Sequence, residues 1–275
     1  GAAYYPEYMP YDRLQEDIAM MQKAGMNTIR IAESTWSTLE PAEGVYDFSY
    51  IDKTLAAAEE AGMYVIIGTP TYAIPSWLEK KCPEVMVFDG YSRKKYGKRQ
   101  IMDIVHPVFR KCAENVICKL LEHTANVSCV IGFQIDNETK HYGTASPQVQ
   151  RMFVEYLKTK FHTTEQLNEV FGLRYWSNSI SDWSDFPDMA GCIHGGLACE
   201  FAKFQRSLAA EYLVWQSELV KKYKRQDQFI THNFDFEWKK FGADIAQDGY
   251  SYGVQPDINH YEASKAVTIA GTDIY

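Results

Sequence analysis

The sequence predicts an α/β fold in which helices cover a parallel sheet, and three observations support this. Strand-like and helix-like runs alternate along almost the whole chain of 275 residues, as in repeated βα units. Several strand-like runs, including Tyr64–Gly68 (YVIIG), are apolar or nearly so throughout, as expected of strands buried on both faces. Polar and aromatic residues gather directly after these runs, so we expect the functional site at the carboxyl ends of the strands.

The first strand is expected at Ala2–Tyr5, where the chain opens into an apolar and aromatic run. A helix is expected at Tyr11–Ala24, because apolar residues recur there at helical spacing and Gly25 follows as a stop signal. The run NTIRIA predicts the second strand at Asn27–Ala32. The helix that follows ends at Ala61, just before a second glycine stop.

The third strand is Tyr64–Gly68, and a helix is expected from about Pro107 to His123. The run CVIGFQI predicts the fourth strand at Cys129–Ile135. Helical periodicity returns at Pro147–Phe161 and at Thr164–Phe171.

Thr163 and Gln166 have the spacing of a capping box for the last of these helices, and Gly172 would end it. A long helix is expected at Leu197–Tyr223. The fifth strand is expected at Phe229–His232 and the sixth at Ala266–Ala270.

An open doubly wound sheet and a TIM (β/α)8 barrel both fit this alternation. A nucleotide-binding sheet should have a glycine-rich turn after its first strand, but the turn here is PEYMP at Pro6–Pro10. We therefore favour the barrel. A barrel needs eight strands and we find six, so either two are hidden or the chain is a piece of a longer enzyme.

We interpret residues 1–275 as one catalytic TIM-barrel domain, incomplete at its C-terminus. The stretch 175–196, rich in Trp, Ser and Asp, is expected to be an insertion in the loop after the fourth strand. A six-stranded piece should not close on its own, and its edges would be exposed and prone to aggregation. We therefore expect residues 1–275 to need the remainder of the enzyme for stable folding.

The composition excludes several classes of protein. The net charge of −8 provides no basic surface for nucleic acid, and no apolar run approaches the roughly 18 residues of a membrane span. The apolar content of 46% is that of a globular protein. The six cysteines form no CxxC pair, so we expect free thiols in a reducing, cytoplasmic compartment.

Asn137 and Glu138 are the first candidates for chemistry, because they follow an apolar strand at the mouth of the expected barrel. Partial burial there would favour the neutral carboxyl, which suits Glu138 as a general acid near neutral pH. Asn137 could bind a sugar hydroxyl beside the reacting carbon. The alternative is that the two residues cap the start of a helix.

Arg30 lies inside an otherwise apolar strand, and a buried guanidinium needs a partner. Glu33 at the end of the same strand could supply one. Arg30 could orient substrate hydroxyls, or it could form a structural ion pair inside the barrel, and the two roles are compatible.

Four tryptophans, Trp36, Trp77, Trp176 and Trp183, fall in expected loops. Indole rings can pack on the C–H faces of sugars, but any one of them could instead cap the core beneath its loop. No HExxH pattern and no GxSxG elbow occurs. We therefore expect no catalytic metal, no cofactor and no serine nucleophile.

The chain resembles glycoside hydrolase family 42, the retaining β-galactosidases. The matching segments occur in family order from end to end of the chain: Tyr4–Glu7, Arg30–Pro41, Gly68–Trp77, Phe133–Glu138, Leu167–Trp176, Thr231–Phe234 and Asp273–Tyr275. Together these segments are far more specific than any one alone.

The resemblance implies a galactoside or oligosaccharide substrate. It also implies a role for each of five individual residues. Glu138 matches the acid/base, and Asn137 the neighbour that binds the sugar 2-hydroxyl. Arg30 and Trp176 match positions that line the galactose subsite, and Tyr275 the tyrosine near the nucleophile. The resemblance also suggests a homotrimer.

The chain departs from the family pattern in two places. The family's nucleophile is a glutamate at the end of the seventh strand, beyond the end of this sequence, so residues 1–275 alone are expected to be inactive. Some members bind structural zinc through a cysteine cluster shortly after the acid/base. The corresponding stretch Thr139–Ser146 has no cysteine, so we expect this zinc site to be absent.

Two other functions stay open at this point. The first is a non-hydrolytic carbohydrate-binding or scaffold barrel that lacks the nucleophile. The second is a related retaining glycosidase that acts on arabinosides or glucosides.

Overall fold

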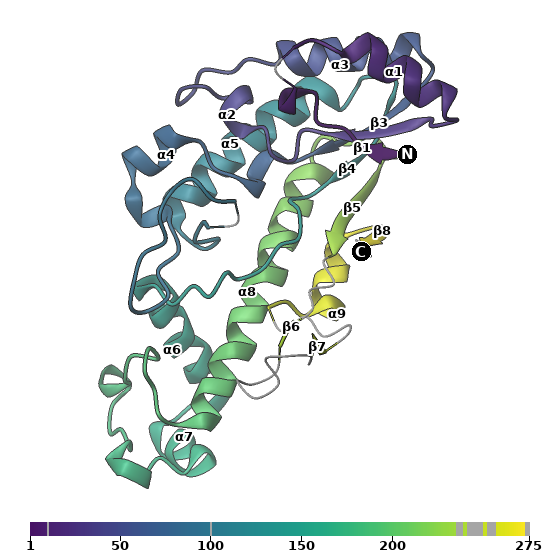
Figure 1. Cartoon of the computed structure of the whole chain (residues 1–275). Coiled ribbons are helices and arrows are strands. Elements are labelled where there is room, and N and C mark those ends of the chain that lie inside the picture. Colours follow the sequence, from purple (N-terminus) through teal and green to yellow (C-terminus); the bar gives the residue numbers. More distant parts are fainter. Residues whose placement is uncertain (10, 100, 235–238, 241–249, 252–256, 273–275) are drawn as a thin grey trace.

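The computed structural model describes residues 1–9, 11–99, 101–234, 239–240, 250–251 and 257–272. Its main sheet has six strands, in the order β1-β2-β3-β4-β5-β8, and each pairs in parallel with the next along the chain (Figure 1). They are β1 (Ala2–Ala3), β2 (Thr28–Ile31), β3 (Tyr64–Gly68), β4 (Val130–Gln134), β5 (Phe229–Phe234) and β8 (Ile269–Thr272).

This strand order identifies the architecture. A doubly wound sheet reverses its order at a switch point, whereas the order here follows the chain without reversal. The sheet is therefore part of a (β/α)8 barrel, as the sequence predicted. Within the described residues β1 and β8 stand at the two ends of the sheet and do not pair with each other, so this half-barrel is open.

Helices lie between successive strands along the chain. The longer ones are α1 (Leu14–Lys23), α3 (Ser49–Glu60), α5 (Pro107–Thr124), α6 (Pro147–Phe161), α7 (Thr164–Phe171) and α8 (Gly195–Lys221). Three short helices follow strand ends or precede β8, namely α2 (Trp36–Leu39), α4 (Ser76–Lys81) and α9 (His260–Ala263). A small antiparallel pair is formed by β6 (Lys239–Lys240) and β7 (Tyr250–Ser251).

Most predicted elements lie where the sequence places them, with shifts at their ends. The third strand has the predicted bounds, whereas β8 begins at Ile269, three residues after the predicted start. Gly25, Gly62 and Gly172 have φ of 77°, 65° and 63° just after α1, α3 and α7, so each is a helix stop as predicted. The predicted capping box is half present: Thr163 Oγ1 accepts from the Gln166 amide at 3.2 Å, but the Thr163 amide donates to the Phe161 carbonyl.

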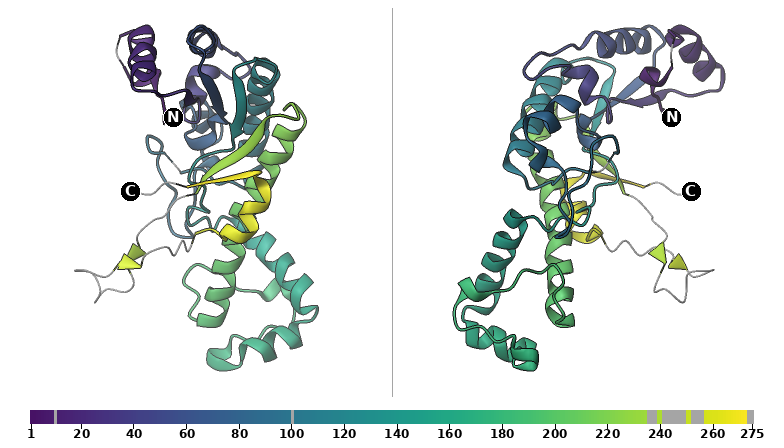
Figure 2. Two further views of the ribbon diagram at one scale, coloured as in Figure 1. Left: turned by 90° about the vertical axis from the view of Figure 1, so that its right-hand side faces the viewer. Right: turned by 60° about the vertical axis from the view of Figure 1, so that its left-hand side comes forward.

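An arm extends away from the sheet (Figures 1 and 2). It consists of α6, α7, the segment that follows α7, and the first half of α8. Phe153 lies at its centre, with the rings of Phe201, Phe204 and Phe186 at 5.0, 5.4 and 5.9 Å. The stretch 175–196 belongs to this arm, so the excursion after β4 includes helices on both sides of it.

Helix α8 joins the arm to the sheet without a break (Figure 1). On its arm side, Gln205 Nε2 donates to the Thr144 carbonyl at 2.7 Å. Three turns later, Gln216 exchanges hydrogen bonds with Thr69 and Thr71 at the end of β3. One helix thus contacts both the end of β3 and the loop that follows β4.

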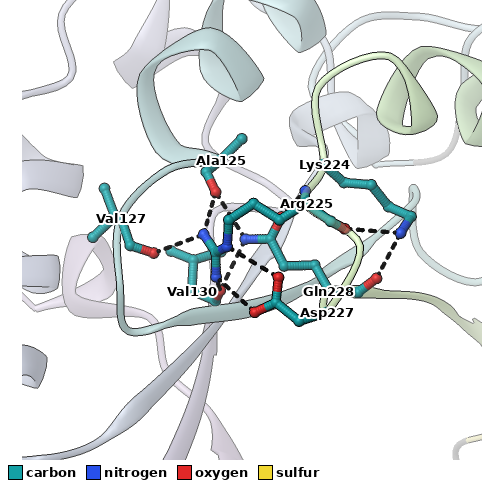
Figure 3. Close-up of polar contacts among 7 residues, drawn as sticks. All are labelled: Ala125, Val127, Val130, Lys224, Arg225, Asp227 and Gln228. Atoms are coloured by element: carbon teal, nitrogen blue, oxygen red, sulfur yellow. Dashed lines mark hydrogen bonds and ion pairs between the residues drawn. The ribbon is translucent and has the colours of Figure 1, made fainter.

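At the amino ends of the strands, a polar cluster surrounds Arg225 (Figure 3). Its guanidinium donates to the carbonyls of Ala125, Val127 and Val130 and pairs with Asp227. Gln228 Nε2 donates to two of the same carbonyls, both at 2.9 Å. The cluster ties the turn before β4 to the turn before β5, at the end remote from the predicted site.

Of the four singled-out tryptophans, Trp36 lies in the core, and Trp77 and Trp183 pack against it. Trp36 is fully buried, and its Nε1 donates to Glu40 Oε2 at 2.7 Å. Trp77 packs edge-on against it, with ring centroids 6.5 Å apart, and donates to the Glu40 carbonyl at 2.8 Å. For these rings, capping of the core is the interpretation that holds.

All six cysteines are free thiols. Among the helices of the described chain, none is both long enough and apolar enough to cross a membrane.

Candidate active site

The site begins where β4 ends. Asp136 and Glu138 both have left-handed backbone conformations, with φ of 46° and 47°, which for a non-glycine residue cost about 1 kcal/mol or more each. Neighbouring strand ends hold them there. The Asp136 amide donates to Thr69 Oγ1 at 2.6 Å, and the Glu138 amide donates to the Asn233 carbonyl at 3.1 Å.

The side chain of Asp136 turns inward and is almost completely buried. Its two carboxyl oxygens accept hydrogen bonds from Thr71 Oγ1, at 2.7 Å, and from Thr139 Oγ1. Burial raises the pKa of Asp136 from 3.8 to about 6, although these hydrogen bonds work in the opposite direction. Gln216 from α8 donates to Thr71 Oγ1 at 2.9 Å, so a polar network underlies the turn that carries Glu138.

Glu138 is half-buried at the sheet mouth. The Tyr72 hydroxyl donates to Glu138 Oε2 at 3.0 Å. Tyr72 belongs to the short 3-10 turn Pro70–Tyr72 directly after β3, and only 5% of it is exposed. A carboxyl group in this setting is partly desolvated and has a fixed hydrogen-bond donor, which are conditions for acid/base chemistry.

Asn137 is buried beside it. Its Oδ1 accepts hydrogen bonds from Gln134 Nε2 and from Asn233 Nδ2, both at 3.1 Å. These two bonds fix the orientation of the amide and leave its NH2 group as the donor of this side chain. A fixed amide donor next to a carboxyl group is suited to bind a hydroxyl near the reacting atom.

Arg30 in β2 has the partner that its burial requires. Its Nε and Nη2 both donate to Glu33 Oε1, at 3.2 and 3.0 Å, and the Tyr5 hydroxyl donates to the same oxygen at 2.8 Å. Glu33 is 1% exposed, and its Oε2 is buried with no hydrogen-bond partner among the described residues.

Tyr72 connects Glu33, the partner of Arg30, to Glu138. Its backbone amide donates to the Glu33 carbonyl at 3.3 Å, while its hydroxyl contacts Glu138. Arg30, Gln134 and Asn233 also line one hollow of about 330 Å³ on the inner face of the sheet. The structure thus places Arg30 in β2 and Asn137 and Glu138 directly after β4, on the two sides of β3.

The two other predicted site residues are not brought to this cluster. Trp176 is 71% exposed and contacts Tyr175 edge-on. It lies in the short 3-10 turn Tyr175–Ser177, which follows α7 in the chain. Tyr275 lies outside the described residues.

Histidine 232 at the end of β5 has a structural role. His232 Nε2 accepts from the Thr139 amide at 3.3 Å, and Nδ1 is 2.7 Å from the Ile135 carbonyl. This pattern requires the neutral ring with its proton on Nδ1. Within the described residues, no group of three His, Cys, Asp or Glu side chains is placed to hold a metal ion.

Sequence reasoning missed two residues of this site. Asp136 and Tyr72 are polar and aromatic residues directly after strands, but the sequence alone assigns no role to either. The available signal was their position directly after β3 and β4. Their partners are 65 and 66 residues away along the chain, which no local pattern indicates.

Comparisons with known proteins agree with one another. Residues 3–263 match the sequence profile of a β-galactosidase family, glycoside hydrolase family 42. A β-galactosidase, BgaA, of a Thermus species is 31% identical over 250 residues, which are 85% of this chain and 37% of that protein.

Solved structures of β-galactosidases also match the chain over its whole length. One is a catalytic mutant of Gan42B, a family 42 β-galactosidase from G. stearothermophilus, with 25% identity, a TM-score of 0.88 and 39% of that chain covered. Another is a cold-adapted β-galactosidase from Rahnella sp. R3, with 26% identity, a TM-score of 0.85 and again 39% covered. The chain thus spans about two fifths of the length of the relatives it matches.

Proposed function

Because the chain belongs to glycoside hydrolase family 42, we propose that the intact protein hydrolyses β-galactosides and releases terminal β-D-galactose with retention of configuration. Glu138 is the general acid/base in this proposal. The observation that carries it is the placement of Glu138 at the carboxyl end of β4, half-buried and hydrogen-bonded to Tyr72, next to the fixed amide of Asn137. Active sites of (β/α)8 barrels lie at this end of the strands.

The reaction would proceed by two displacements. In the first, Glu138 donates its proton to the departing glycosidic oxygen while a second carboxylate attacks the anomeric carbon. In the second, Glu138 as carboxylate takes a proton from water, which attacks the same carbon and releases galactose. The residue resemblance assigns the second carboxylate to a seventh strand, which these residues do not include.

Arg30 and Asn137 position the sugar in this proposal. Asn137 donates to the hydroxyl beside the reacting carbon, and Arg30 binds a hydroxyl farther round the ring while Glu33 holds its guanidinium. Roles for Trp176 in the galactose subsite and for Tyr275 near the nucleophile stay predictions. A Trp176→Ala variant tests the first through the KM for galactosides.

The cytoplasmic location and the homotrimer are further parts of the proposal. The first rests on the content of unpaired cysteines and the second on the family resemblance alone. Light scattering on the intact protein tests the trimer.

The activity is tested with a panel of nitrophenyl glycosides and the intact protein. We expect turnover of the β-galactoside and much less of the arabinoside and glucoside. Preferred turnover of either of those would replace galactose as the substrate, and no turnover of any would favour the non-hydrolytic barrel.

The role of Glu138 is tested with Glu138→Gln, and Glu114→Gln on the exposed side of α5 is the matched control. Substrates with poor leaving groups need the proton, whereas activated aryl galactosides need it little. We therefore expect the variant to lose far more activity on lactose than on a dinitrophenyl galactoside. Equal losses on both substrates would contradict the acid role.

A further inference from the structure

The side chain of Tyr72 contacts the proposed acid/base directly. Its hydroxyl lies 3.0 Å from Glu138 Oε2 and is the donor in that bond. The phenol is held in place on three sides. Pro70 begins the turn that carries it, the Tyr72 amide donates to the Glu33 carbonyl, and the Arg99 guanidinium lies over the ring, 5.2 Å from its centroid.

The phenol keeps its proton throughout the working pH range. Burial, followed by the charge of Glu138, raises the pKa of Tyr72 above its usual range. The hydroxyl is therefore a permanent donor. A donor that bonds to a carboxylate stabilises the ionised form relative to the protonated form. Partial burial of Glu138 acts in the opposite direction, so the two effects oppose each other at this one group.

The acid/base must exist in both forms during a retaining reaction, first as the acid and then as the base. Burial favours the protonated form of Glu138 and so disfavours the carboxylate that the second displacement needs. A rigid donor on Oε2 offsets that effect and also restricts rotation of the carboxyl group. The backbone is fixed as well, through the bond from the Glu138 amide to the Asn233 carbonyl.

We propose that Tyr72 is a positioning residue for this reaction: its hydroxyl holds the Glu138 carboxyl group in one orientation and stabilises it as carboxylate. The inference rests on the proposed function, because it assigns Tyr72 a part in the work of Glu138. Tyr72 acts through Glu138 and needs no contact with the sugar.

The test is Tyr72→Phe in the intact protein, which removes one hydroxyl and keeps the ring. The matched control is Tyr156→Phe in the arm, because the Tyr156 hydroxyl donates to a buried glutamate, Glu200, in the same way at 2.5 Å. We expect kcat/KM of Tyr72→Phe to fall by about 10- to 100-fold, as for misplacement of a catalytic group. The control should keep the activity of the original protein.

The pH profile separates positioning from packing. Without the donor the carboxylate is less stable, so the high-pH limb of kcat/KM should move up by about one pH unit. A fluorinated tyrosine at position 72 is a stronger donor of the same shape and should move this limb down. If neither variant moves the limb relative to the control, Tyr72 only packs and the proposal is overturned.

A second measurement does not depend on turnover. Carbon-13 labelling of the glutamate carboxyl groups allows Glu138 to be titrated by NMR, with Glu138→Gln identifying its signal. Tyr72→Phe should raise the pKa of Glu138 by about one unit, and Tyr156→Phe should leave it unchanged. If the original protein hydrolyses no galactoside, the proposed function fails, while this titration still decides for or against the role of Tyr72.

Discussion

Arg30 places two of its nitrogens on a single oxygen of Glu33, three residues later in the chain, and the other carboxyl oxygen of Glu33 is buried without a described partner. The Tyr5 hydroxyl donates to the same oxygen, Glu33 Oε1. This one-sided arrangement holds the guanidinium beside the sheet mouth.

Glu33→Gln should therefore affect both stability and sugar binding. The substitution keeps the size of the side chain but leaves the half-buried Arg30 without a counter-charge, which should cost about 1–3 kcal/mol of unfolding free energy. The KM for galactosides should rise as Arg30 loses its fixed orientation. Urea denaturation and steady-state kinetics measure the two effects.

The control is Glu16→Gln, because Arg13 and Glu16 form an ion pair with the same spacing of three residues. The Glu16 side chain is 72% exposed, so its loss should cost less than about 1 kcal/mol. Similar losses in the two variants would show that burial of the Arg30 pair is unimportant.

Asp136→Asn should change how stability depends on pH. The pKa of Asp136 is raised from 3.8 to about 6 in the folded protein, so folding favours the protonated carboxyl. The contribution of this protonated carboxyl to the free energy of unfolding is complete below about pH 4 and is lost as the pH rises through about 6. The neutral amide avoids this loss, so Asp136→Asn should gain about 3 kcal/mol relative to the original protein between pH 4 and pH 7.

Denaturation at several pH values measures this difference, and exposed Asp12→Asn serves as the control. Parallel stability curves for the original protein and Asp136→Asn would mean that Asp136 is not desolvated as described.

Gly68→Ala, at the end of β3, should disturb the ion pair of Arg30 and Glu33 at the end of the neighbouring β2. A Cβ atom at Gly68 would lie 2.6 Å from Glu33 Cβ and 2.9 Å from its Cα, so the end of β2 must move. Overpacking of this kind costs about 1–3 kcal/mol, and the KM should rise with it. Gly195→Ala, where a Cβ meets nothing within 4 Å, should leave both thermal stability and KM unchanged.

Arg225→Ala should destabilise the protein without changing catalysis directly. Arg225 satisfies three carbonyls at the end of the sheet remote from Glu138 (Figure 3), and hydrogen bonds from a charged donor contribute about 1.5–3 kcal/mol each. We expect a lower Tm, with kcat/KM retained at temperatures where the variant is folded. Exposed Gln226→Ala is the control, and an unchanged Tm in Arg225→Ala would contradict this role.

The sequence predicts those parts of the fold that short-range patterns determine. Tyr64–Gly68 is found with its bounds because an apolar run between a glycine stop and a polar turn is a local signal. The last strand is displaced, because its position depends on pairing of Ile269 with Thr231, 38 residues away. Ala266, the first residue of the predicted strand, is instead the last residue of the 3-10 turn Ser264–Ala266.

The site divides in the same way. The pairing of Arg30 with Glu33 follows from their separation of three residues at one strand end. The bond from Tyr72 to Glu138 joins residues 66 positions apart and depends on β3 and β4 being neighbours. Trp36 and Trp77 fall in loops by pattern but are directed into the core by Glu40, a partner that their spacing does not reveal.

The two glutamines of α8 limit how this region can change in length. Gln205 and Gln216 are 11 residues apart, which is about three helical turns, so they lie on the same side of the helix. Insertion or deletion of one residue between them would rotate one glutamine by about 100° relative to the other and would break contact with Thr144 or with Thr69 and Thr71. Natural variation in chain length is therefore expected in the outer part of the arm, while the spacing between these two glutamines stays constant.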